Sequence, residues 1–137
     1  MSHPWTETID VRVYYEDTDF SGRVYHASYL RFLERGRTEW LRQRGFGHRE
    51  LAGSSRVVFA VRSLQIEYLA PALMDDLLRV ETQIAGFRGA SLDFLQRIFR
   101  GEKELVTATV LVAAIRDGRP SRIPDPLRRM MVAPARG

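Results

Sequence analysis

The sequence predicts an α+β fold in which a curved antiparallel sheet wraps around one long central helix. Three observations carry this prediction: one segment with helical periodicity, several segments with strand alternation, and short polar turns between those strands. The expected order is one strand, one long helix and then about four strands. Because a single helix must cover an entire antiparallel sheet, we expect the sheet to curve around it.

The first half of the chain is expected to form a strand followed by the helix. Residues 8–15 alternate, with Ile9, Val11, Val13 and Tyr15 on one side. Residues 27–44 place their apolar side chains on one stripe at about 100° per residue, which predicts a helix. Ser28, or a residue just before it, is a candidate N-cap, and Gly45 suits the position after the helix. Gly36 lies inside the stripe and indicates a close approach to another backbone.

The second half is expected to form antiparallel hairpins. Alternating segments within 56–70, 77–86, 91–100 and 104–116 predict four long strands joined by short turns. From about residue 118 the chain is rich in proline, and we expect a finishing tail with one helical turn at "PLRRMM". The 137 residues fit one domain over 1–137. A single sheet and helix leave an edge or face to protect, which favours dimerisation.

Composition excludes several classes of protein. The chain has no cysteine, which excludes disulfides, thiolate metal sites and a cysteine nucleophile. Its three histidines have no metal-ligand spacing, so no metal or other cofactor is expected. No apolar run reaches the length of about 18 residues needed to span a bilayer, and no secretory signal is apparent. We therefore expect a cytoplasmic protein with no transmembrane segment.

The charge favours phosphorylated partners of small size. The net charge is +4, from 21 lysine and arginine residues against 17 acidic ones, and all the basic residues except Lys103 are arginine. Arginine binds phosphate in a bidentate manner, in a small molecule as well as in nucleic acid. No nucleic-acid-binding motif is present, so nucleic acid is disfavoured. A generic solvated surface is the alternative, because the arginines are scattered.

The stretch "YYEDTDFSGRVYHASYLRF", residues 14–32, crowds three carboxylates in front of the expected helix. Acids in this position are commonly solvated turn residues, or they place favourable charge near the positive end of the helix dipole. We keep that interpretation for Glu16 and Asp17, with Asp17 orienting the turn. Asp19 is treated differently because of a longer pattern that contains it.

That pattern resembles the hotdog-fold thioesterases, in particular the acyl-CoA thioesterases associated with the Tol-Pal envelope system, close to the 4-hydroxybenzoyl-CoA thioesterase type. The segment "VRVYYEDTDFSGRVYHASYLRFLERGRTEWLR" is similar to that subfamily's signature, in which an Asp-Thr-Asp-x-x-Gly-x-Val-Tyr-His element leads into the central helix. The similarity continues through "FAVRSLQIEYLAPALMDDLLRVET" and "GASLDFLQRI". The resemblance implies a hotdog fold, hydrolysis of acyl-CoA to free acid and CoA, and a dimer or dimer of dimers (a homotetramer) with its site between protomers.

The resemblance also assigns site residues. Asp19 matches the catalytic carboxylate, and His26 matches the position whose backbone amide faces the thioester carbonyl. Tyr25 belongs to the Tyr-His pair, although such a tyrosine is more often a core residue than a catalyst. Gly22 would let the backbone approach the substrate, with Val24 beside it. The sequence departs from the family at Phe20 and Ser21, where a small pair is common.

Thioester hydrolysis needs few catalytic groups, which agrees with a site built on one carboxylate and the start of the helix. The thiolate leaves with a pKa of about 8 to 9 and needs little acid assistance, so one carboxylate and one oxyanion site suffice. Asp19 either attacks the carbonyl, forming an anhydride, or takes a proton from the attacking water. Free N–H groups at the start of the helix would stabilise the oxyanion. Glu34 and Glu39, on the helix itself, are expected to be structural or exposed.

Substrate contacts and rival functions remain open at this point. Arg88, in the loop "GFRGAS", is a candidate for phosphate contact and Arg62 is a weaker one; a surface arginine is at least as good an interpretation of either. The guesses for the residues that line the acyl pocket are Phe20, Phe32, Phe59 and Tyr68. An acyl carrier protein is a competing thioester carrier, and a non-catalytic scaffold or acyl-binding role beside envelope or phospholipid machinery is the rival from another class. A hotdog dehydratase is disfavoured.

Overall fold

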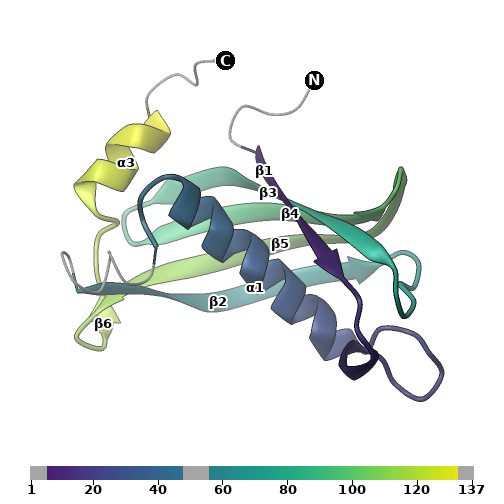
Figure 1. Ribbon diagram of the computed structural model, residues 1–137. Coiled ribbons are helices and arrows are strands. Elements are labelled where there is room, and N and C mark those ends of the chain that lie inside the picture. Colours follow the sequence, from purple (N-terminus) through teal and green to yellow (C-terminus); the bar gives the residue numbers. More distant parts are fainter. Residues whose placement is uncertain (1–5, 48–55, 133–137) are drawn as a thin grey trace.

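One antiparallel sheet curves around a single long helix in the computed structural model, which describes residues 6–47 and 56–132 (Figure 1). In this described part the sheet has six strands, ordered β1-β3-β4-β5-β2, and β6 pairs with β5. In chain order the elements are β1 (Thr6–Arg12), the 3-10 helix η1 (Tyr15–Asp17), α1 (His26–Gln43), β2 (Val57–Tyr68), β3 (Leu77–Arg88), β4 (Ser91–Arg100), β5 (Lys103–Arg116), β6 (Arg119–Pro120) and α3 (Asp125–Val132). The predicted succession of one strand, one long helix and four long strands is confirmed.

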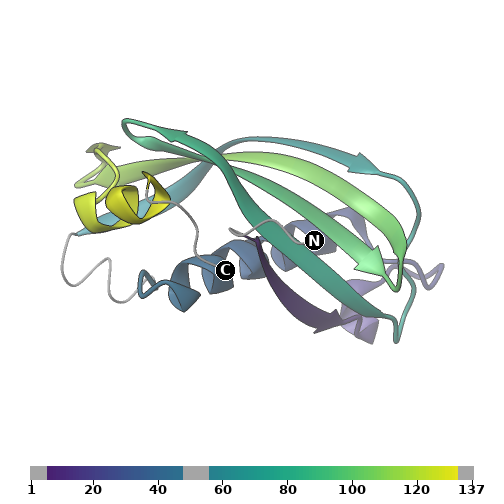
Figure 2. The ribbon, with the colours of Figure 1, turned by 90° about the horizontal axis from the view of Figure 1, so that it is seen from above.

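The core lies between α1 and the concave face of the sheet, and the view from above shows the strands arching over the helix (Figure 2). Inward-facing residues of the strands alternate with outward-facing ones, as half-buried strands require. From the helix, Phe32, Leu33 and Trp40 are fully buried, and they meet a sheet face that includes Leu78, Val80, Phe94, Ile98 and Val110. Helix α1 therefore forms the centre of the core.

The first strand is shorter than the sequence predicts. Strand β1 ends at Arg12, and Tyr15 lies in η1 with 80% of its surface exposed, so its predicted place on the buried side of a strand is wrong. The Asp17 carboxylate causes the early turn, because its Oδ2 accepts a hydrogen bond from the Tyr14 N–H at 2.8 Å. A local side-chain acceptor thus competes with the sheet for the backbone.

The two predicted helix ends have different outcomes. The Ser28 cap is wrong: α1 begins at His26 after Tyr25, no side chain caps it, and Ser28 lies buried within the first turn. Gly45 is confirmed after the helix, with a φ of +83° and its N–H bonded to the Arg42 carbonyl at 3.0 Å. A positive φ favours glycine, which explains the sharp stop.

Gly36 confirms a close approach, although to side chains rather than to a backbone. A Cβ at this position would lie 2.6 Å from Thr82 Oγ1 on β3 and 3.0 Å from Gln96 Nε2 on β4. Gln96 is fully buried, and its Nε2 donates hydrogen bonds to Leu33 O and Thr82 Oγ1, both at 2.8 Å. The missing side chain therefore makes room for a buried polar contact between helix and sheet.

The C-terminal tail contributes to the core. Helix α3 spans eight residues, longer than the single predicted turn. Ile123 and Leu127 are buried, and the Ile123 N–H donates to the Gly89 carbonyl at 2.9 Å. Tertiary burial rather than local propensity stabilises so short a helix. The described tail is thus packed structure and not only a finishing loop.

Candidate active site

A tight loop carries the predicted catalytic carboxylate at the end of the molecule where α1 begins. Thr18 and Val24 pair across the loop, and the Asp19 N–H donates to the Arg23 carbonyl at 3.0 Å. The Gly22 N–H donates back to the Asp19 carbonyl at 3.0 Å, which closes a β-turn with Gly22 at a φ of +83°. The positive φ explains the need for glycine at the position predicted to approach the substrate.

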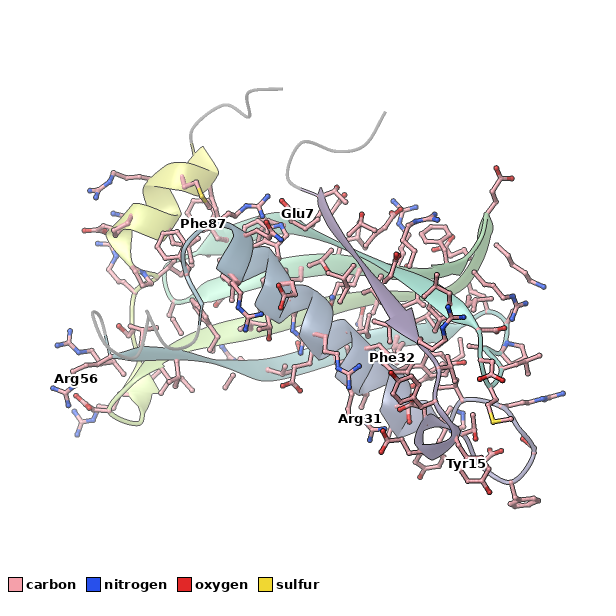
Figure 3. The ribbon with its side chains drawn as sticks, in the orientation of Figure 1. Glu7, Tyr15, Arg31, Phe32, Arg56 and Phe87 are labelled. Carbon is pink, nitrogen blue, oxygen red and sulfur yellow. The ribbon has the colours of Figure 1, made fainter. Side chains whose placement is uncertain are left out.

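Asp17 holds the two ends of this loop through hydrogen bonds. It is buried, and its Oδ1 accepts a hydrogen bond from Arg31 Nη2 at 3.2 Å while its Oδ2 holds the Tyr14 N–H. Its carbonyl accepts the Tyr25 N–H at 3.0 Å. Figure 3 shows Tyr15 and Arg31 together at this end of the molecule. The interpretation of Asp17 as a residue that orients the turn is confirmed.

Asp19 is exposed, and Ser21 holds one of its two oxygens. Oδ1 accepts a hydrogen bond from the Ser21 N–H at 2.8 Å and another from Ser21 Oγ. These two bonds are the main reason that the pKa of Asp19 is lowered from its ordinary value, with smaller contributions from the charges of Arg23 and His26. Asp19 is therefore ionised at neutral pH, as a nucleophile or a general base must be.

A cleft of about 400 Å³ opens beside Asp19. Its lining residues come from the loop, the start of α1 and the end of β2 with the segment after it: Asp19, Ser21, Arg23, Val24, His26, Tyr29, Tyr68, Leu69, Ala70 and Pro71. Four of the residues predicted from the sequence, namely Asp19, Val24, His26 and the acyl-pocket candidate Tyr68, thus meet at one cavity. The cavity combines charged and polar groups with apolar walls in similar proportion, which suits a small molecule that carries both kinds of group.

The start of α1 offers unused hydrogen-bond donors at this cleft. No described group accepts a hydrogen bond from the backbone N–H of His26 or of Ala27, while the Ser28 N–H donates to the Tyr25 carbonyl at 2.9 Å. The first N–H groups of a helix carry partial positive charge and bind anions. Because His26 lines the cleft and Ala27 does not, the start of α1 reaches the cleft at His26, next to these free donors.

Aromatic rings form one wall of the cleft. The His26 and Tyr68 rings meet edge to face with centroids 5.0 Å apart, and the Tyr29 and Tyr68 centroids are 5.4 Å apart. The Tyr29 hydroxyl accepts a hydrogen bond from the Ala72 N–H at 2.9 Å. Burial raises the pKa of both tyrosines, so their phenols are neutral at neutral pH.

Other predicted residues lie outside this cleft. Tyr25 is exposed and precedes the helix without lining the cavity. Arg62 is exposed on β2, and Arg88 ends β3, whose first residue Leu77 lies near the catalytic loop; 11 steps of about 3.3 Å put Arg88 roughly 36 Å along the strand. One chain therefore does not bring Arg88 to Asp19, and both phosphate contacts remain predictions.

Of the residues predicted to line the acyl pocket, some lie at the cleft and others do not. Tyr68 lines the cleft, Phe32 is fully buried and Phe20 is fully exposed, so neither phenylalanine lines the cleft in one chain. Phe59 lines a separate hollow of about 260 Å³ between α1 and β2. Sequence reasoning did not find the roles of Ser21 and Tyr29. The spacing of Ser21 two residues after an aspartate, common in side-chain turns, was the available signal for the first.

Two further findings concern metal binding and membrane-spanning helices. Within residues 6–47 and 56–132, no group of three histidine or acidic side chains is arranged to hold a metal ion. Over the same described ranges, no helix has the length and apolarity needed to cross a bilayer.

Comparison with known proteins identifies the family. Residues 13–131 match the model of the thioesterase-like superfamily. The acyl-CoA thioester hydrolase YbgC of Escherichia coli is 52% identical over 106 residues, covering 77% of this chain and 78% of the relative. The acyl-CoA thioesterase YbgC of Haemophilus influenzae is 48% identical over 109 residues, covering 80% of each.

A solved structure agrees with these sequence matches. The probable thioesterase of Bartonella henselae has a TM-score of 0.84 and 45% identity, covering 87% of this chain and 99% of that one. Both the family and the fold inferred from the stretch around Asp19 are therefore confirmed. The chain belongs to the thioesterase-like superfamily and has the hotdog fold.

Proposed function

We propose that this chain hydrolyses acyl-CoA thioesters to free acid and CoA, with Asp19 as the catalytic carboxylate. The observation that carries the proposal is the meeting of an ionised carboxylate and unused helix N–H groups at one cleft. The names of the relatives from Escherichia coli and Haemophilus influenzae supply the substrate class. No metal or other cofactor is required for this chemistry.

Two routes fit this geometry. In the first, an Asp19 oxygen attacks the thioester carbonyl, the C–S bond breaks, CoA leaves as the thiolate, and water then hydrolyses the acyl-aspartyl anhydride. In the second, Asp19 takes a proton from water as the water oxygen adds to the carbonyl, and the C–S bond breaks as the tetrahedral intermediate collapses. In both, the N–H groups of His26 and Ala27 stabilise the oxyanion.

The test is thiol release from short, long and aromatic acyl-CoAs by wild type, Asp19→Asn and Glu16→Gln. Glu16 is an exposed acid in the same stretch that does not line the cleft, so it is the matched control. We expect Asp19→Asn, still folded, to lose about 100-fold or more in kcat/KM, and Glu16→Gln to stay close to wild type. An Asp19→Asn variant as active as wild type would remove Asp19 from the mechanism.

The active form is proposed to be a homodimer or a dimer of dimers. Strand β2 is an edge strand whose Val58 and Val61 are 49% and 51% exposed, which is unfavourable in an isolated chain. Glu34 and Arg37 both line the hollows between α1 and β2 without an ion pair to each other. In a dimer with a two-fold axis beside these hollows, Glu34 of one copy would lie near Arg37 of the other.

Sedimentation equilibrium tests this assembly. A lysine at Val61 would place a charge on the β2 edge, so Val61→Lys should weaken association and lower activity together. Thr8→Lys, on the opposite edge strand β1, is the control and should do neither. A wild-type protein that sediments as a monomer and is fully active would contradict a site shared between protomers.

The second candidate substrate is an acyl group carried by acyl carrier protein. The net charge of +4 favours an acidic carrier that presents the same pantetheine thioester. Turnover of acyl carrier protein esters but of no CoA ester would favour this alternative, and turnover of neither would favour a scaffold role beside envelope machinery such as Tol-Pal. A cytoplasmic location is proposed with either, and a chain without cysteine is compatible with it.

A further inference from the structure

Ser21 is the described residue that contacts the Asp19 side chain most directly. Both of its donors, the backbone N–H and the hydroxyl, bond to the same carboxylate oxygen, Oδ1. No described group donates a hydrogen bond to the other oxygen, Oδ2. The two carboxylate oxygens are therefore unequal: Oδ1 accepts two hydrogen bonds from Ser21, and Oδ2 accepts none from the described residues.

The surrounding turn fixes Ser21 in this position. The Gly22 N–H bonds to the Asp19 carbonyl, and the Asp19 N–H bonds to the Arg23 carbonyl, both at 3.0 Å. The loop is tied in turn to the segment after β2, because the Met74 N–H donates to the Gly22 carbonyl at 3.2 Å. Ser21 thus has little freedom to leave Asp19 while the turn is formed.

We propose that Ser21 is a positioning residue for hydrolysis, which holds Oδ1 of Asp19 so that Oδ2 faces the thioester. This inference rests on the proposed catalytic role of Asp19. An exposed aspartate otherwise rotates freely about its side-chain torsions, and only a fraction of its orientations aims an oxygen at the carbonyl. Fixing one oxygen raises the fraction of molecules that are ready to react.

The same contact adjusts the chemistry of the carboxylate. Hydrogen bonds donated to the charged form favour that form, which agrees with the lowered pKa of Asp19. A carboxylate stabilised in this way is also a better leaving group when an anhydride with it is hydrolysed. Ser21 thus favours the ionised form of Asp19.

A purely structural role for Ser21 predicts different results. If Ser21 only stabilises the turn, its loss would loosen the loop, and any other substitution that loosens the loop would act in the same way. Thr18 supplies this comparison, since its hydroxyl donates to the Tyr15 carbonyl at 2.8 Å instead of to the Asp19 carboxylate. Thr18→Val therefore removes a loop hydroxyl without changing the carboxylate.

The experiment is a carboxyl ¹³C NMR titration of Asp19 together with pH profiles of kcat and KM. Four proteins are compared in the full-length chain: wild type, Ser21→Ala, Ser21→Thr and Thr18→Val. We expect Ser21→Ala to raise the Asp19 pKa measurably and to lower kcat by about 3- to 10-fold with little change in KM, because orientation acts on attack rather than on binding. Ser21→Thr, which keeps the hydroxyl, should restore both values.

The outcomes separate this inference from the proposed function. An unchanged Asp19 pKa in Ser21→Ala, or an equal rise in Thr18→Val, would overturn the positioning role even if Asp19→Asn is inactive. Full activity of Asp19→Asn would instead overturn the catalytic role of Asp19, whatever the titration shows. The NMR readout needs no substrate, so an unsuitable choice of acyl-CoA does not affect it.

Discussion

Replacing Gly36 by alanine should destabilise the protein, although alanine is the better helix former. The gain in helix propensity is about 1 kcal/mol. Against it, the new Cβ would lie 2.6 Å from Thr82 Oγ1 and 3.0 Å from both Gln96 Nε2 and Val80 Cγ1. Overpacking of this kind costs about 1 to 3 kcal/mol, and a displaced, fully buried Gln96 amide adds about 1 to 3 kcal/mol. The mid-range sum is a net loss of roughly 3 kcal/mol of unfolding free energy.

Urea denaturation followed by circular dichroism measures this loss directly. Gly86→Ala is the matched control, because the nearest atom to its new Cβ is Asp93 Oδ2 at 4.0 Å. In a Thr82→Ala background the closest contact is removed, so Gly36→Ala should destabilise less there than in wild type. A Gly36→Ala protein as stable as wild type, with an unchanged slope in urea, would refute the close-packing argument.

Three further predictions concern the tail, the carboxylate and the buried tyrosine. Leu127→Ala should destabilise by about 2 to 5 kcal/mol in the same denaturation assay, because a fully buried leucine in α3 leaves a cavity; a loss below about 0.5 kcal/mol would mean that the tail does not belong to the core. Since the pKa of Asp19 is lowered, kcat/KM should persist as pH falls and decline only below about pH 4; an acid limb centred above pH 5 would contradict this assignment. Tyr29→Phe leaves the buried Ala72 N–H without its acceptor, so it should cost about 1 to 3 kcal/mol and lower kcat, whereas wild-type stability would show that the bond contributes little.

Long helices and strands were predictable from the sequence because burying one face makes apolar residues recur, about every 3.6 residues in a helix and every second residue in a strand. Helix α1 and strands β3, β4 and β5 show such repeats in their burial, whereas β2 is largely exposed in the single chain. The end of β1 was not predictable, since it depends on Asp17 capturing the Tyr14 N–H. Helix α3 is too short for periodicity to define it, and the burial of Leu127 stabilises it.

The site was predictable only as far as its motif extends along the chain. Asp19 and His26 lie within one stretch of eight residues, so the pattern itself brings them together. Tyr68 and Ala72 come from the end of β2 and the segment after it, and only tertiary structure places them at the same cleft. The reason is general: a motif reports contacts between neighbours in sequence, while cavity walls come from distant segments.

The Ala72 peptide group has a consequence for the order of folding. Its N–H donates to the Tyr29 hydroxyl and its carbonyl accepts the Val24 N–H. The catalytic loop and the start of α1 are therefore held by a residue that lies 43 positions after Tyr29 in the chain. During synthesis, the loop around Asp19 emerges well before this partner and has nothing to dock against. Contacts of such long range close late, after the entropy of the intervening chain has been overcome. A nascent or truncated chain that ends before Ala72 should therefore contain every residue of the catalytic motif and still lack an ordered catalytic loop.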